Sequence, residues 1–180
     1  NGDKENREIW NSFRKPSVDD IKKTLSLLNI DFDLWLGESD ANDDINMLVP
    51  EFRAKNFTKM SEGAEVIDLS DYPMNNSPVP PFIVVKSNGA VMYGMTDMGT
   101  LYDRVKRKHA DIIWYVVDSR QSLHFHQVFS AAEITGVKGN AELEHLSFGS
   151  VLGPDGKPLK TRNGDNVSLI DLISSTIKSL

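Results

Sequence analysis

The sequence predicts an α/β fold, part of a doubly wound parallel sheet with helices on both faces and with small β-hairpin insertions. Expected strands and helices alternate through the second half of the chain, a pattern that produces parallel strands. An apolar run over 112–117 turns polar at Asp118 and continues as a helical pattern, as a buried strand does when it delivers a loop to a ligand crevice. A glycine-spaced basic loop follows at 149–162. Together these features favour a nucleotide site.

The first part of the chain, residues 1–80, is expected to contain helices and a hairpin. Helical patterns cover 6–13 and 17–28, and Ser17 is a suitable N-cap for the second of them. A short strand is expected over 32–36, where the chain reaches a glycine. These patterns predict two separate helices followed by a strand.

A third helix is expected over 43–56, with a break at Pro50 because proline lacks the N–H that the helix needs. Glu62-Gly63 predicts the turn of a hairpin over 59–69. The proline-rich stretch 71–81 then predicts a connector. This connector is the expected internal boundary.

The second part, residues 81–180, predicts a hairpin around Ser87-Asn88-Gly89 and then alternating helices and strands. Gly136 is a suitable C-terminal stop for the helix before it. The expected elements are strands 82–86 and 90–93, helix 96–108, strand 112–117, helix 122–135, strand 143–148 and a helix from 168 to the end.

Composition limits the function classes. The chain has 180 residues, of which 39% are hydrophobic, so it can bury one sizeable core. A net charge of −6 argues against gripping nucleic acid with the whole surface, and the cations gather locally at 104–109 and 157–162. The first of these groups is also typical of a solvated helix end. Without cysteine there are no disulfides or thiolate metal sites. No apolar run is long enough to span a membrane, so we expect no membrane contact. We also expect a cytoplasmic protein that is monomeric.

Several strings resemble one family in their order and spacing. They are Leu36-Gly37-Glu38-Ser39, Lys86-Ser87-Asn88-Gly89, Tyr93-Gly94-Met95-Thr96-Asp97, Val116-Val117-Asp118-Ser119-Arg120-Gln121-Ser122-Leu123-His124-Phe125-His126-Gln127, the glycine-spaced loop and Leu169-Ile170-Asp171-Leu172-Ile173. Across nearly the whole chain, this series is similar to the carboxyl half of the catalytic domain of arginyl-tRNA synthetase, a class I aminoacyl-tRNA synthetase. The resemblance implies a Rossmann-like nucleotide-binding fold.

The resemblance also implies an arginine site. A guanidinium and an α-amino group call for carboxylates and neutral acceptors, and the matching residues are Glu38, Tyr93, Asp97 and Gln121. Tyr93 and Asp97 are four apart, so both project from one face if a helix begins near Tyr93. Other interpretations stay open: Asp97 as an ordinary first-turn acid, Tyr93 as strand core and Glu38 as a turn residue.

For ATP, the resemblance implies a site formed by His124, Gln127, Gly149, Val151 and Lys157. The start of a helix after a strand also suits a nucleotide, because free backbone N–H groups are available there. His124 and His126 are two apart on an expected helix and point in different directions, so no metal site is expected. His126 could equally be a capping or core histidine.

The loop 156–164 corresponds, by resemblance, to the mobile signature loop of class I synthetases, usually Lys-Met-Ser-Lys-Ser. Pro158 and Thr161 stand where the two lysines would be, so Lys157 is the expected substitute cation, assisted by Lys160 and Arg162. Cations here would stabilise the pyrophosphate leaving group. The alternative is an exposed polar hairpin.

The His-Ile-Gly-His type signature of class I synthetases is absent, so we expect residues 1–180 to be a single partial catalytic domain, a fragment that is inactive alone. Its parent would use ATP, with Mg²⁺, to convert arginine to arginyl-adenylate and then charge tRNA(Arg). One alternative is a noncatalytic arginine- or nucleotide-binding module, a truncated paralogue. Another is an unrelated α/β nucleotidyl transferase with no preference for arginine over lysine.

Overall fold

The structure, a computed structural model, describes residues 3–149 and 169–178. The chain divides into two compact units, one formed by Asn1–Trp35 with Leu152–Leu180 and one by Leu36–Val151. The expected single partial catalytic domain, with its boundary between residues 80 and 81, stays a prediction. Each unit is described by itself below.

The first unit contains α1 (Lys4–Ser26) and α5 (Leu169–Lys178). The prediction of two helices before residue 29 was wrong, because α1 runs without interruption through Pro16. Ser17 is not an N-cap, since its hydroxyl donates to the Phe13 carbonyl oxygen at 2.9 Å. The cap is Asp3, whose carboxylate accepts from the Asn6 N–H at 2.9 Å. Pro16 lies in an exposed stretch of α1, a helix in which no residue is buried among the described residues.

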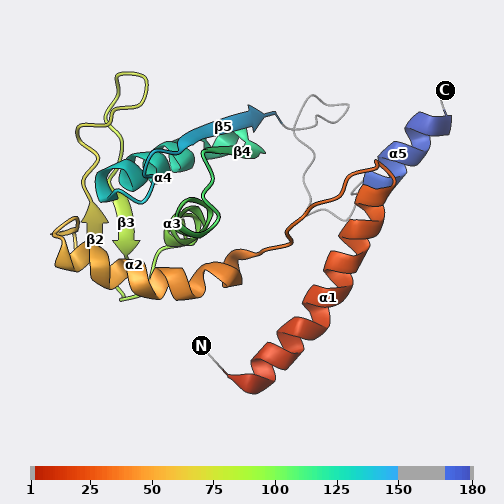
Figure 1. Ribbon diagram of the computed structural model, residues 1–180, viewed down its shortest axis with the longest axis horizontal. Coiled ribbons are helices and arrows are strands. Elements are labelled where there is room, and N and C mark those ends of the chain that lie inside the picture. Colours follow the sequence, from red (N-terminus) through yellow and green to blue (C-terminus); the bar gives the residue numbers. More distant parts are fainter. Residues whose placement is uncertain (1–2, 150–168, 179–180) are drawn as a thin grey trace. The chain divides into compact units, whose positions relative to one another are not determined.

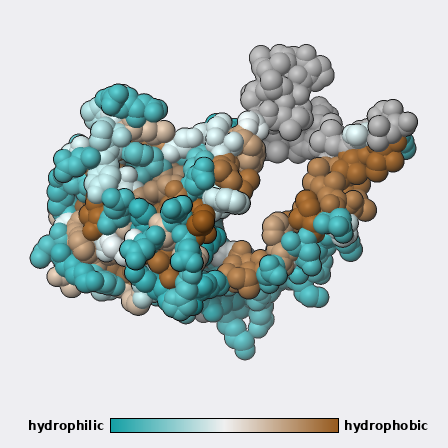
Figure 2. All heavy atoms as spheres, turned by 45° about the horizontal axis from the view of Figure 1, so that its top comes forward, coloured by the Kyte–Doolittle hydropathy of each residue, from teal (hydrophilic) through white to brown (hydrophobic). Residues whose placement is uncertain are grey.

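Apolar side chains are exposed along both helices of this unit, and Figure 2 shows them as a brown surface. Ile21 and Leu25 of α1 and Leu169 and Ile170 of α5 line a shared hollow of about 290 Å³. The predicted strand over 32–36 is absent from the described residues, because this stretch pairs with no other strand. Within this stretch, Phe32 meets Trp35 edge to face, with ring centroids 5.4 Å apart.

The second unit begins with a short 3-10 helix, η1 (Glu38–Ala41), and α2 (Asn42–Ala54). The predicted break at Pro50 was wrong, since α2 continues through it. Pro50 is exposed, whereas the opposite face of the helix buries Ile45, Leu48, Val49 and Phe52. Burying four large apolar side chains outweighs the cost of one missing backbone hydrogen bond.

Strands β1 (Lys59–Ser61), β2 (Ala64–Ile67) and β3 (Phe82–Val85) form an antiparallel sheet in that order. The predicted first hairpin is confirmed, and its turn residues Glu62 and Gly63 have φ values of 49° and 79°. The second hairpin is reduced to one bridge between Val85 and Val91. It stops there because the chain enters the next helix at Gly94.

The following helix, α3 (Gly94–Tyr102), begins slightly before its predicted start and passes into a π-helical turn, η2 (Asp103–Arg107). Figure 1 shows α3 between α2 and α4 (Ser122–Thr135). Its approach to η1 is close. A Cβ on Gly99 would lie 3.1 Å from the Ala41 carbonyl oxygen and 3.3 Å from the Asp44 Cβ, so glycine is what allows the contact.

Strands β4 (Ile112–Asp118) and β5 (Glu142–Phe148) pair in parallel and are joined through α4, as predicted. Gly136 ends α4 in the left-handed conformation with a φ of 72°. Only one face of β4 is covered among the described residues: Ile113 and Tyr115 are buried, whereas Ile112, Trp114 and Val116 are 57–65% exposed. The expectation of a fully buried strand was therefore wrong for this part of the chain.

The second unit has one hydrophobic core, to which α2, the strands β2, β3 and β4, and the helices α3 and α4 all contribute. Its fully buried large side chains are Phe52, Leu48, Ile67, Leu69, Met95, Met98, Leu101, Val84 and Val128. The α/β class, with a parallel pair and antiparallel hairpins, is confirmed. In residues 3–149 and 169–178, no helix has the length and apolar character needed to cross a membrane.

Candidate substrate site

Tyr93 and Asp97 lie one turn apart at the start of α3. Tyr93 is the N-cap residue and already has helical backbone angles, so both side chains project from the same face, as the four-residue spacing predicts. Tyr93 is 59% exposed, and it is therefore not a core residue of a strand. Asp97 is in the first turn, where an acid also stabilises the helix dipole.

His124, in the first turn of α4, meets both of these residues. Its Nε2 lies 2.7 Å from the Asp97 Oδ2. Its ring stacks on Tyr93, with centroids 5.2 Å apart and planes 26° from parallel. The starts of α3 and α4 thus bring a carboxylate, an imidazole and a phenol together. We call Tyr93, Asp97 and His124 the recognition cluster.

A hollow of about 230 Å³ adjoins this cluster. Tyr93, His124 and Gln127 line part of it, and residues 80–83 of the connector and β3 line another part. The Gln127 Nε2 donates to the Pro80 carbonyl oxygen at 2.8 Å, which ties α4 to the proline-rich connector. The hollow therefore has one aromatic wall and one wall of connector backbone, a surface that suits a flat ligand group.

His126 and His124 point in different directions, as expected. The His126 Nε2 lies 2.8 Å from the Tyr72 carbonyl oxygen, so this histidine holds the connector and serves the structure. Its role agrees with the interpretation as a capping or core histidine.

The other predicted site residues lie in several places. Gln121 is exposed at the end of η3 (Ser119–Gln121) and is the N-cap residue of α4, three positions before His124. Glu38 is exposed at the start of η1, and Gly149 follows β5, where no atom of the described residues lies within 4 Å of the position of an added Cβ. Among the described residues, Tyr93, Asp97 and His124 make direct contact, whereas no hydrogen bond joins Gln121 or Glu38 to them. Val151, Lys157, Lys160 and Arg162 lie outside the described residues.

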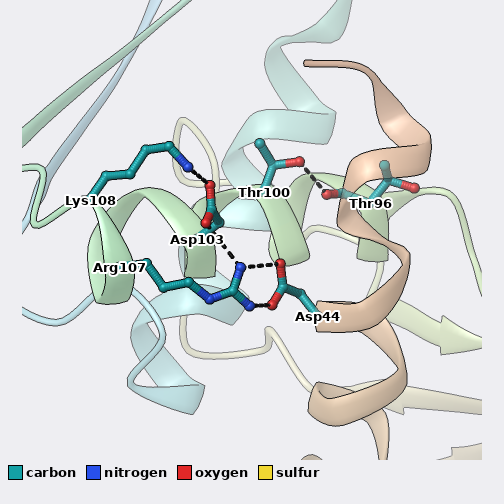
Figure 3. Close-up of polar contacts among 6 residues, drawn as sticks. All are labelled: Asp44, Thr96, Thr100, Asp103, Arg107 and Lys108. Atoms are coloured by element: carbon teal, nitrogen blue, oxygen red, sulfur yellow. Dashed lines mark hydrogen bonds and ion pairs between the residues drawn. The ribbon is translucent and has the colours of Figure 1, made fainter. Parts of the chain in front are cut away.

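The cations at 104–109 are engaged within the fold and do not simply form a solvated helix end. Arg107 pairs with Asp44 of α2 and with Asp103, and Lys108 also pairs with Asp103 (Figure 3). Asp44 is buried. Hydrogen bonds from Lys108, and more weakly from Arg107, hold the pKa of Asp103 below its ordinary value. This network, which we call the α2–η2 clamp, fastens the C-terminal end of the α3 segment.

Tyr115 of β4 lies in the core beneath this segment. Its ring packs against Phe125 and Phe129, with centroids 4.9 and 5.1 Å away. Burial raises the pKa of Tyr115, and the nearby Arg104 guanidinium, 5.3 Å from the ring centroid, partly offsets that effect. The hydroxyl has no hydrogen-bond partner of good geometry within the described part of the chain.

The contact between His124 and Asp97 is the feature that sequence reasoning missed. The two residues are assigned by resemblance to different ligands, and they are far apart in the chain. No local pattern pairs them, because α3 follows β3 of the antiparallel sheet whereas α4 follows β4 of the separate parallel pair.

Comparison with known proteins shows the family to which the chain belongs. Residues 1–179 match the family model for the tRNA synthetases class I (R), catalytic domain. The structure also resembles that of the arginyl-tRNA synthetase from Plasmodium falciparum, with a TM-score of 0.80 and 26% sequence identity over 99% of this chain. The chain belongs to the class I arginyl-tRNA synthetase catalytic domain family.

Curated relatives are similar over most of this chain. An arginine–tRNA ligase of Francisella tularensis subsp. novicida (strain U112) is 51% identical over 167 residues, and one of Alkaliphilus oremlandii (strain OhILAs) is 43% identical over 166. Each alignment covers 92% of this chain but 28% of the relative. The chain likewise spans 28% of the Plasmodium protein. It therefore corresponds to a little over a quarter of the length of these relatives.

Proposed function

We propose that this chain is part of an arginyl-tRNA synthetase that activates arginine with ATP to arginyl-adenylate and then transfers the arginyl group to tRNA(Arg). The recognition cluster carries the proposal. A partly exposed carboxylate beside an exposed aromatic ring is the chemistry that binds a guanidinium, through charge-assisted hydrogen bonds and stacking. Family membership supplies the reaction.

In this proposal, Tyr93 and Asp97 bind the guanidinium end of arginine. Gln121 and Glu38 bind its other polar groups, with Gln121 supported by its position at the start of α4, three residues before His124. Catalysis then depends mainly on positioning and on stabilising charge. No covalent intermediate with the protein is needed.

ATP is proposed to bind along the edge where β4 and β5 end. Gly149 lies directly after β5, and its open surroundings allow close approach of a phosphate. His124 and Gln127 lie at the start of α4, on the hollow beside Tyr93. Mg²⁺ would be held through ATP itself and would neutralise part of the charge on its phosphates.

The remaining proposed residues are Val151 for ATP and, within the loop at 156–164, Lys157, Lys160 and Arg162 for the leaving group. This part of the proposal rests on the sequence, since the loop lies outside the described residues. The cations would stabilise the charge that develops on pyrophosphate.

The direct test compares the purified 180-residue chain with the full-length protein that contains it. The full-length protein should charge tRNA with arginine and discriminate strongly against lysine, whose point charge cannot make the planar contact. The isolated chain should show no arginine-dependent ATP turnover. If the full-length protein fails to charge tRNA while calorimetry shows arginine binding, the noncatalytic binding module would replace the synthetase.

A further inference from the structure

We propose that His124 is a positioning residue for arginine recognition, acting through Asp97 and Tyr93. One imidazole would set the direction of the carboxylate and the plane of the aromatic ring that both face the substrate. This inference rests on the proposed function and deepens it, because it gives His124, which resemblance assigns to the ATP site, a further role in arginine recognition.

The hydrogen bond between His124 and Asp97 has a clear direction. An ionised carboxylate can only accept, so the His124 Nε2 must carry the proton and donate to the Asp97 Oδ2 over 2.7 Å. In the described part of the chain, His124 is the only side chain that hydrogen-bonds Asp97. The Oδ1 oxygen therefore has no competing side-chain donor there and can accept from a guanidinium N–H.

Burial distinguishes the support from the group that it supports. The side chain of His124 is 14% exposed, whereas that of Asp97 is 35% exposed. The donor is thus less exposed than the carboxylate that it supports. A planar guanidinium requires a carboxylate held in one orientation, and a fixed donor from behind provides that orientation.

The imidazole is itself held in place on several sides. Tyr93 stacks on one face, and the Phe125 ring lies edge to face at 5.2 Å. The start of α3 is also near, because a Cβ on Gly94 would come within 3.7 Å of the His124 Cε1. This packing orients the ring so that Nε2 faces Asp97, while the outer face of Tyr93, 59% exposed, stays open to a ligand.

The experiment measures tRNA charging by the full-length protein, with Michaelis constants for arginine and ATP determined separately. His124→Phe keeps an aromatic ring for Tyr93 and removes the donor. It should raise the arginine Michaelis constant by roughly tenfold or more, and by more than it raises that of ATP. His124→Gln, whose Nε2 can reach the same oxygen, should restore most of the loss.

The matched control is His126→Gln, two positions along the same helix, whose wild-type imidazole faces the Tyr72 carbonyl. It should leave the arginine constant unchanged. Circular dichroism of every variant separates misfolding from a site effect, and the rescue by glutamine keeps the test decisive if phenylalanine impairs folding.

Three results would overturn the positioning role: a higher Michaelis constant for ATP alone, equal losses for Phe and Gln, or unchanged arginine kinetics in His124→Phe. Failure of the proposed function looks different, because the wild-type protein itself would then show no arginine-dependent charging.

Discussion

Two aspartates lie at the α3 segment, and their carboxylates pair with different groups. Asp44 is buried and is occupied by a guanidinium of the same chain, that of Arg107, at the C-terminal end (Figure 3). Asp97 is at the N-terminal end, is partly exposed and is held on one oxygen by His124. At the C-terminal end of the α3 segment, a carboxylate is therefore paired with a guanidinium of the same chain. At the N-terminal end, we propose that a carboxylate is available to the guanidinium of the substrate.

The difference shows how burial decides between structure and recognition. A buried carboxylate needs a permanent partner, since leaving it unpaired is costly. A carboxylate at the surface can remain without a protein cation until a ligand binds, because water solvates its charge. The α2–η2 clamp and the contact at Gly99 hold α3 against α2, so Tyr93 and Asp97 of the recognition cluster lie at the start of a helix that is fastened at its far end.

The largest effect should come from Asp97→Asn in the full-length protein. Losing the charge-assisted partner of the substrate should cost about 2 to 4 kcal/mol in arginine affinity or turnover, while stability hardly changes. Steady-state charging kinetics measure the loss. Unchanged Michaelis constant and turnover would mean that Asp97 is only a first-turn acid, and the comparison with Asp44 would collapse.

Asp44→Ala should instead affect local stability and have little effect on arginine binding. Without Asp44, Arg107 keeps Asp103 but loses α2, so amide hydrogen exchange in η2 and the end of α3 should accelerate by about tenfold. The arginine Michaelis constant should change far less than in Asp97→Asn. Asn46→Ala, at an exposed position of the same helix, is the control. Equal exchange in wild type and Asp44→Ala would show that the clamp does not stabilise this segment.

Glu65 provides a second intramolecular carboxylate–guanidinium pair with a pH signature. Hydrogen bonds from Arg53 hold the pKa of Glu65 below its ordinary value of 4.5, against the opposing effect of burial. Because the pKa of Glu65 is lower in the folded than in the unfolded protein, its ionised form stabilises the fold at pH values above the unfolded-state pKa. This stabilisation is lost as the pH falls through the folded-state pKa.

Glu65→Gln should therefore be less stable than wild type at neutral pH, by no more than ~1 kcal/mol because Arg53 is largely exposed. The two proteins should converge in acid, below the folded pKa. Urea unfolding followed by circular dichroism between pH 7 and pH 3 measures this. A stability difference that is constant down to pH 3 would exclude the ionised pair as its cause.

The smallest effect is expected for Tyr115→Phe, which keeps the ring packing and removes a buried hydroxyl that has no hydrogen-bond partner of good geometry among the described residues. Stability should be unchanged or rise by roughly 0.5 kcal/mol, because no hydrogen bond is lost and no polar group is left unpaired. Urea unfolding tests this. A clear loss of stability would reveal that the hydroxyl has a partner, with Arg104 the nearest candidate.

Local sequence patterns determined much of this fold. The turn at Glu62-Gly63, the stop of α4 at Gly136 and the parallel strand at 112–118 follow from backbone preferences and short-range periodicity, which a reader of the sequence can see. The same local rules failed at Pro16 and Pro50. There the proline lies on the exposed side, and for α2 packing of the opposite face decides the outcome.

In the candidate site, too, some features follow from local sequence patterns and others only from tertiary packing. The four-residue spacing of Tyr93 and Asp97 determined that they share a helix face, once the helix start was known. Only the tertiary structure decided that His124 joins them, that Asp44 receives Arg107 and that His126 turns away to the connector. These contacts join residues from 27 to 63 positions apart, and such pairings depend on how helices and strands pack, which no local pattern encodes.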